Sequence, residues 1–152
     1  MVILGYLLED IPKEYQGLAF SIHKLTGLSI LALMILRALW RVTNTKPVLN
    51  VRAWERIAER TVHFLLYVVA IAMPLVGWMG SVAGGKPPHL GTFNFELPIE
   101  KNKALAGLFF DMHNTLAICL IVLFAIHVLA ALYHHFIKKD GVLRRMLPSR
   151  HV

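Results

Sequence analysis

At 152 residues the chain has room for one domain and is too short for two of ordinary size. Hydrophobic residues make up 57% of it, charged residues only 16%, and the mean hydropathy is +0.59, which indicates a fold surrounded by lipid. This composition excludes a disordered chain, and the single cysteine, Cys119, excludes a disulfide scaffold. The net charge of +7 would suit nucleic acid, but the basic residues lie between apolar runs. We therefore interpret them as charges that orient a membrane protein, with no nucleic-acid partner.

The sequence predicts an all-α transmembrane helical bundle, a single domain over residues 1–152. Three stretches, at about 18–42, 61–82 and 110–137, reach the roughly 20 apolar residues that a span needs. Pro74 lies inside the second span and is expected to bend or locally unwind it. Residues 1–8 are apolar but too short to span, so they resemble the end of a helix that begins upstream; a short interfacial segment is the alternative.

The basic residues predict the orientation. The connection between the first two spans and the C-terminal tail hold most of them: Arg37, Arg41, Lys46, Arg52, Arg56, Arg60, Lys138, Lys139, Arg144, Arg145 and Arg150. The other side holds only Lys13, Lys24, Lys86, Lys101 and Lys103, diluted by acidic residues. By the positive-inside rule, we expect a multi-pass protein of the bacterial inner membrane with its C-terminus in the cytoplasm. Trp40, Trp54 and Trp78 fall near expected span ends, where indole anchors are common.

Eight histidines in so apolar a chain are candidates for function, because ionisable groups are costly inside a membrane. His113 and His127 are 14 residues apart in the third expected span, which corresponds to about 21 Å of helix and leaves both within about 40° of one face. Two ligands so far apart suit two stacked cofactors better than one metal ion. His134 extends this face to the cytoplasmic boundary, where His134 and His135 could equally be headgroup contacts.

His23 lies at the depth of His113 in the first span, and Gly27 follows one helical turn later, leaving room for a planar macrocycle beside His23. A bis-imidazole iron site needs two neutral histidines from different helices, and His23 with His113 meets that requirement. No CxxCH motif is present, so a haem would be held without a thioether link, as haem b is. A single such histidine is more often a packing residue, but the agreement among His23, His113 and His127 favours a functional set. His63 is balanced between the two interpretations, and His89 and His151 are assigned to solvent.

These residues resemble the bacterial cytochrome b561 family of small di-haem membrane cytochromes, related to the b subunits of hydrogenase and formate dehydrogenase. The matching elements are His23-Lys24-x-x-Gly27, Arg37-x-x-Trp40-Arg41, His63-x-x-Leu66-Tyr67, Gly77-Trp78, the His113/His127 pair and Tyr133-His134-His135-Phe136.

The resemblance implies four helices, with the iron of an outer haem b ligated by His23 and His113 and one ligand of an inner haem supplied by His127. The other inner ligand lies on the family's first helix, of which residues 1–8 match only the end. We therefore expect the outer haem here, and a truncated reading frame or a late start codon as the cause of the missing helix. His63 is a conceivable substitute ligand, but we expect it to lie too close to the surface to meet His127.

The resemblance also implies transmembrane electron transfer between a periplasmic partner and a membrane quinone. One family activity is superoxide oxidation coupled to ubiquinone reduction, with His134, and also His63, at the quinone end. Lys86, Lys101 and Lys103 would steer a small anion, although contact with lipid phosphates is the interpretation we favour for them. The alternatives are a haem-carrying anchor subunit for a dehydrogenase or hydrogenase, and a haem-deficient truncated homologue; a homodimer would close the bundle's open wall. No catalytic residue is assigned.

Overall fold

The fold is a small bundle of long helices with one short hairpin. The computed structural model describes residues 1–44 and 53–139. In chain order the elements are α1 (Val2–Leu7), α2 (Lys13–Thr43), α3 (Ala53–Ala83), β1 (His89–Leu90), β2 (Phe93–Asn94), α4 (Lys103–Tyr133) and a π-helical turn, η1 (His134–Lys138). Within this part of the chain, three helices are long and apolar enough to cross a membrane. The predicted all-α bundle with three full spans is therefore confirmed.

The spanning helices are longer than the sequence predicts. A helix of 31 residues, such as α2, is about 46 Å long, whereas the hydrocarbon core of a bilayer is about 30 Å thick. The helix α3 begins at Ala53 rather than near residue 61, and α4 begins at Lys103 rather than near residue 110. Asn102 caps α4 by accepting a hydrogen bond from the backbone N–H of Leu105 at 3.1 Å. The helices begin earlier than the expected spans because polar residues end an apolar span without ending the helix.

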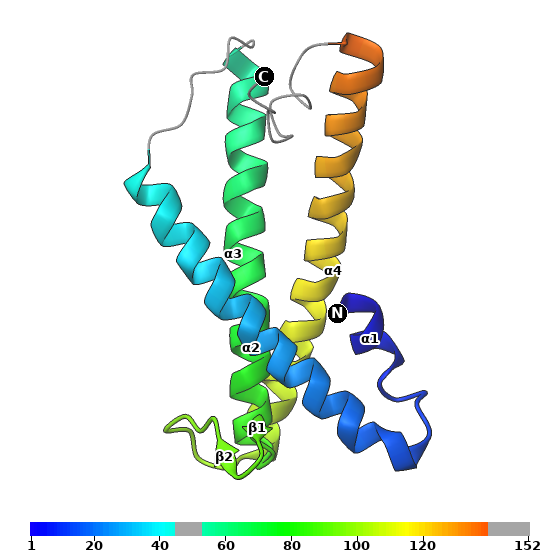
Figure 1. The fold of residues 1–152 in the computed structure, drawn as a ribbon, viewed down its shortest axis with the longest axis vertical. Coiled ribbons are helices and arrows are strands. Elements are labelled where there is room, and N and C mark those ends of the chain that lie inside the picture. Colours follow the sequence, from blue (N-terminus) through cyan, green and yellow to red (C-terminus); the bar gives the residue numbers. More distant parts are fainter. Residues whose placement is uncertain (45–52, 140–152) are drawn as a thin grey trace, which may run out of the picture.

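The helices α3 and α4 run antiparallel and pack along each other, while α2 crosses them diagonally (Figure 1). Small residues permit the close approach of α3 and α4: a Cβ atom added at Gly80 would lie 3.1 Å from the Cβ of Phe109 and 3.1 Å from a ring carbon of Phe110. The helix α3 is unbroken through Pro74, so the local unwinding considered above does not occur. The buried residues of α3 cluster in its second half, from Val69 to Ala83.

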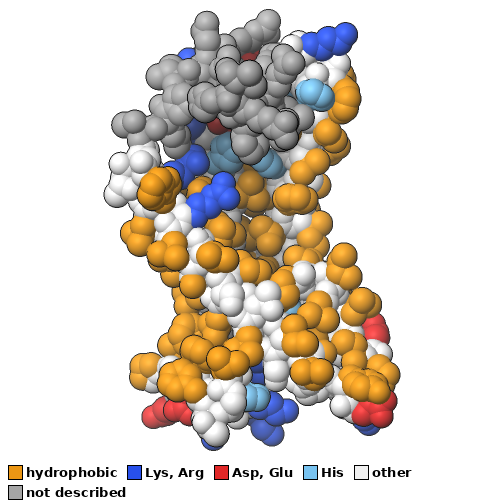
Figure 2. All heavy atoms as spheres, in the orientation of Figure 1, with side chains coloured by type: hydrophobic (Ala, Val, Ile, Leu, Met, Phe, Trp, Pro, Cys, Tyr) orange, Lys and Arg blue, Asp and Glu red, His pale blue; other side chains and the backbone are white. Residues whose placement is uncertain are grey.

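Most large apolar side chains face outward, as expected for a fold whose solvent is lipid. Figure 2 shows hydrophobic side chains covering the middle of the visible face, with charged side chains gathered toward the two ends. The side of the membrane on which each end lies remains a prediction. Several residues on which that prediction rests lie outside the described part of the chain: Lys46, Arg52, Arg144, Arg145 and Arg150, as does His151.

The connection between α3 and α4, residues 84–102, is held against the helices by backbone hydrogen bonds and by three hydrogen bonds that side chains donate. The carbonyl oxygen of Lys86 accepts from the Nζ of Lys24 at 2.8 Å and from the Oγ of Ser81 at 2.5 Å. The Nε1 of Trp78 donates to the carbonyl oxygen of Phe95 at 2.8 Å. Trp78 is half-buried and anchors this loop through its indole N–H, a contact that the sequence pattern does not reveal.

Candidate functional site

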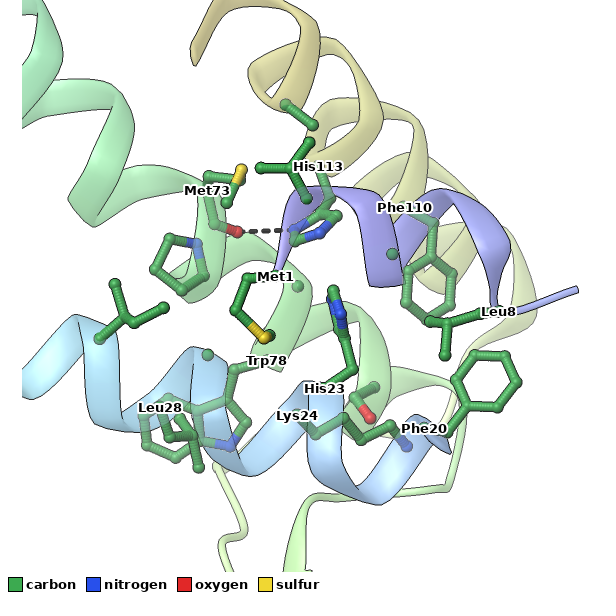
Figure 3. A pocket seen from close by; sticks show the side chains of 18 of the residues that line it. Met1, Leu8, Phe20, His23, Lys24, Leu28, Met73, Trp78, Phe110 and His113 are labelled. Carbon is green, nitrogen blue, oxygen red and sulfur yellow. Dashed lines mark hydrogen bonds between the residues drawn. The ribbon is translucent and has the colours of Figure 1, made fainter. Parts of the chain in front are cut away.

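The clearest candidate site is formed by His23 of α2 and His113 of α4. Their ring centroids are 6.1 Å apart and the ring planes are inclined by 73°. Figure 3 shows the two imidazoles pointing toward one another from their separate helices into one cavity. The structure therefore brings together the two histidines that the sequence places at equal depth.

His113 is held in one orientation by the backbone of α3. Its Nδ1 lies 2.8 Å from the carbonyl oxygen of Met73. Because a carbonyl oxygen only accepts, Nδ1 carries the proton, and the Nε2 of His113 keeps its lone pair for a ligand. This arrangement is the usual second contact of a metal-ligating histidine, which fixes the tautomer and raises the basicity of the other nitrogen.

The approach of His113 to α3 depends on Gly77. A Cβ atom at this position would lie 2.6 Å from the Nδ1 of His113 and 2.9 Å from its Cε1. His23 is packed against Gly5 in a similar way, because a Cβ atom added at Gly5 would lie 3.0 Å from the Cε1 of His23. The Gly77-Trp78 pattern was visible in the sequence without a physical reason, and the contact with His113 supplies that reason.

His23 has a buried Nδ1 with no hydrogen-bond partner among the described residues. Buried polar atoms are almost always paired, so an orphaned ring nitrogen at a cavity indicates a position where a further group is bound. His23 thus offers the cavity a nitrogen that the described residues leave without a hydrogen bond.

The cavity has a volume of about 220 Å³ and a largely apolar wall. Its lining comes from α1, α2, α3, α4 and the connecting loop, and includes Met1, Tyr6, Phe20, Leu28, Met73, Pro74, Trp78, Pro88, Phe110 and Ala117. Gly27 is also part of this wall, and a Cβ atom there would meet nothing within 4 Å. The open space beside Gly27 agrees with the room that the sequence predicts for a planar group next to His23.

A second histidine pair lies toward the other end of the bundle. The rings of His63 on α3 and His127 on α4 are 5.1 Å apart and inclined by 60°. The expectation that His63 lies too close to the surface to meet His127 is therefore wrong. Because α3 begins at Ala53, His63 lies three helical turns inside the helix and reaches the depth of His127. Glu59, one turn earlier, lies 3.6 Å from the Nδ1 of His63.

His134 begins the π-helical turn that follows α4. Its half-buried ring lies 6.0 Å from that of Tyr133, and the neighbouring His135 stacks edge-on with Phe136 at 4.7 Å. Lys138 closes this turn by an ion pair with Glu55 of α3. A π-helical turn often marks a functional position in a helix, so the geometry is compatible with the candidate assignment of His134.

The nitrogen donors come in pairs. Within residues 1–44 and 53–139 there is no cluster of three or more His, Cys, Asp or Glu side chains able to hold a bare metal ion. Two imidazoles facing each other across an apolar cavity instead suit a planar cofactor that supplies the remaining ligands of its own metal.

Residues 1–149 match the family described as prokaryotic cytochrome b561. The chain belongs to this family. It is 34% identical to cytochrome b561 homolog 2 of Escherichia coli K12 over 130 residues, which are 84% of this chain and 69% of that protein. It is 32% identical to cytochrome b561 homolog 1 of the same organism, over 84% of this chain and 74% of that protein. A protein of Yersinia pestis named probable superoxide oxidase CybB is 29% identical, over 91% of this chain and 80% of its own length.

Membership of the cytochrome b561 family makes this a haem b-dependent electron-transfer protein of a bacterial membrane, with several spans. His23 and His113, called the outer pair below after the family's outer haem, have the donors and surroundings that such a cofactor needs. Their two imidazoles lie 6.1 Å apart at a cavity with a largely apolar wall, and they would hold the group between them.

Proposed function

We propose that this cytochrome b561 carries electrons through a haem b held by His23 and His113, between a donor at that end of the bundle and a membrane quinone. The observation that carries the proposal is the pair of imidazoles 6.1 Å apart across an apolar cavity. Haem b supplies reversible one-electron chemistry when bound. The protein positions the ligand nitrogens, with Met73 fixing the tautomer of His113, and the apolar wall excludes water.

The inner pair is assigned differently. The rings of His63 and His127, called the inner pair, lie 5.1 Å apart, closer together than the 6.1 Å of the outer pair. On family resemblance we propose His127 as a ligand of a second haem, with His63 as its partner only if the two rings separate. The haem count of the purified protein distinguishes one site from two.

At the quinone end we propose that His134 and His63 hydrogen-bond the quinone oxygens or transfer their protons. Both side chains are half-buried, and an imidazole ring can both donate and accept a hydrogen bond through its two nitrogens. Reduction of ubiquinone consumes two electrons and two protons, so a group that delivers protons is required there. We also propose that this end and the C-terminus face the cytoplasm.

Superoxide is the small-molecule donor that we propose, since the Yersinia pestis relative is named a probable superoxide oxidase. Two superoxide anions would each lose one electron and leave as dioxygen, while one quinone gains both electrons and two protons. Lys24, Lys86 and Lys101 line a polar cavity at the donor end, where positive charge would attract an anion.

A pyridine haemochrome assay on detergent-purified protein tests the site. We expect His23→Ala and His113→Ala each to remove the same haem, and His89→Ala, on the exposed hairpin, to retain it. Two haems in the wild type, with one lost in His63→Ala and His127→Ala, would establish the inner pair as a second site. Full haem content in both His23→Ala and His113→Ala would refute the proposal.

A further inference from the structure

A compact group of basic side chains lies where α2 meets α3, near the end of α2. We call Arg37, Arg41 and Tyr67 the arginine cluster. The Nε of Arg37 donates a hydrogen bond to the Oη of Tyr67 at 3.1 Å. The guanidinium carbon of Arg41 lies 5.2 Å from the centre of the Tyr67 ring, and that of Arg37 lies 6.0 Å from it. Two cations therefore converge on one aromatic side chain.

The arginine cluster is rich in hydrogen-bond donors and poor in acceptors. Arginine has five N–H groups and accepts nothing, and the hydrogen bond from Arg37 already uses the Tyr67 oxygen. Within residues 1–44 and 53–139, the other N–H groups of Arg37, those of Arg41 and the O–H of Tyr67 have no hydrogen-bond acceptor and are left to donate. A ligand for this cluster must therefore present acceptor oxygens.

In the part of the chain that the structure describes, no carboxylate compensates the charge of the arginine cluster. Among the described residues, no Asp or Glu lies within ion-pair distance of Arg37 or Arg41. The acidic side chains of the first turns of α3 have other contacts, since Glu55 pairs with Lys138 and Glu59 lies beside His63. A neutral acceptor such as a quinone carbonyl would satisfy the donors but leave two like charges close together. An oxyanion accepts hydrogen bonds from the donors and also compensates the two positive charges.

The position of the cluster identifies the source of that oxyanion. Arg41 lies in the last turn of α2, and the neighbouring Leu39 and Trp40 are 60% and 71% exposed. Large apolar side chains exposed at the end of a spanning helix face lipid, and Trp is enriched at the level of the headgroups. Figure 2 shows Lys and Arg side chains on the face over the upper part of α2, next to hydrophobic ones. Lipid phosphates occupy this level of a bilayer.

We propose that the arginine cluster is a binding site for the phosphate of an anionic membrane lipid, such as phosphatidylglycerol. Arg37 and Arg41 supply charge and paired N–H donors, which suit phosphate oxygens. Tyr67 holds Arg37 in place and adds its O–H, so the site spans α2 and α3. Basic pockets between spanning helices bind anionic headgroups in the same way. The proposal is independent of haem and of the electron donor.

The test is native mass spectrometry of the delipidated protein in detergent, titrated with phosphatidylglycerol or with phosphatidylcholine of the same chains. We expect one tightly retained phosphatidylglycerol and weaker retention of phosphatidylcholine. Each of Arg37→Gln and Arg41→Gln should weaken phosphatidylglycerol retention about fivefold, and the double variant about thirtyfold. Arg60→Gln, which removes a charge from the same end but outside the cluster, is the matched control and should retain the lipid.

The folded state of each variant is checked by circular dichroism. Should the double variant fail to fold, Tyr67→Phe provides the second test, because it keeps both charges and removes the hydroxyl that positions Arg37. It should weaken phosphatidylglycerol retention less than either arginine variant does. If Arg60→Gln and Arg41→Gln weaken phosphatidylglycerol retention equally, the proposal is overturned, since diffuse attraction between charges would then explain the binding. The proposal is also overturned if Arg41→Gln retains phosphatidylglycerol as the wild type does but loses quinone binding or has a shifted haem spectrum. The arginine cluster would then bind the quinone or the haem.

Discussion

Gly77→Ala tests the geometry of the outer site without removing a ligand. The added methyl carbon would lie 2.6 Å from the Nδ1 of His113 and 2.9 Å from its Cε1, well inside the 3.5–4.0 Å or so of an ordinary contact. The ring of His113 or the backbone of α3 must move. Either displacement lengthens the 2.8 Å hydrogen bond between His113 and the carbonyl of Met73.

The expected cost is about 2 kcal/mol of unfolding free energy. Forcing a methyl group into a packed contact costs about 1–3 kcal/mol, and the weakened hydrogen bond costs about 1 kcal/mol more. Replacing glycine by alanine inside a helix stabilises the folded state by about 1 kcal/mol, which offsets part of this cost. For a chain of this length the net loss corresponds to a melting temperature lowered by about 4–8 °C.

The assay is thermal unfolding in detergent, followed by circular dichroism, together with the haem content of the purified variant. Gly107→Ala is the matched control, because Gly107 lies in α4 and a Cβ atom there would meet nothing within 4 Å. It should leave the melting temperature unchanged or raise it. Gly77→Ala should lower it and also reduce haem content, since the tautomer of His113 is no longer fixed. Equal melting temperatures and equal haem content in the two variants would refute the reasoning.

Three further changes have defined outcomes. Gly27→Leu should fill the open space beside His23 and lower haem content, with helix content unchanged by circular dichroism; full haem content would show that the cofactor does not lie there. Asn102→Ala removes the cap that accepts from the N–H of Leu105 at 3.1 Å and should lower the unfolding free energy by about 1 kcal/mol, measured by thermal unfolding. Trp78→Phe removes the 2.8 Å hydrogen bond to the carbonyl of Phe95, so hydrogen exchange in residues 84–102 should become faster, and an unchanged rate would show that the bond does not hold the loop.

Hydropathy and spacing were sufficient to predict the spans, because a membrane requires long apolar helices whose backbone hydrogen bonds are internal. They also predict that His23 and His113 share one level, since rise per residue is nearly constant along a helix. Helix ends were predicted less well. The helices α3 and α4 extend eight and seven residues beyond the expected starts, at about 61 and 110, because charged residues outside the hydrocarbon still favour helix.

The sequence by itself therefore determined the class, the spans and the outer histidine pair. Only the tertiary structure decided which atoms fix those histidines and which side chains meet across helices. The carbonyl of Met73 carries no sequence signal, and the close approach at Gly77 exists only because α3 packs against α4. The same packing brings His63 to His127 and Arg37 to Tyr67, contacts set by the rotation and crossing of whole helices. Periodicity along one helix fixes a face, but the neighbour of that face depends on how the helices pack.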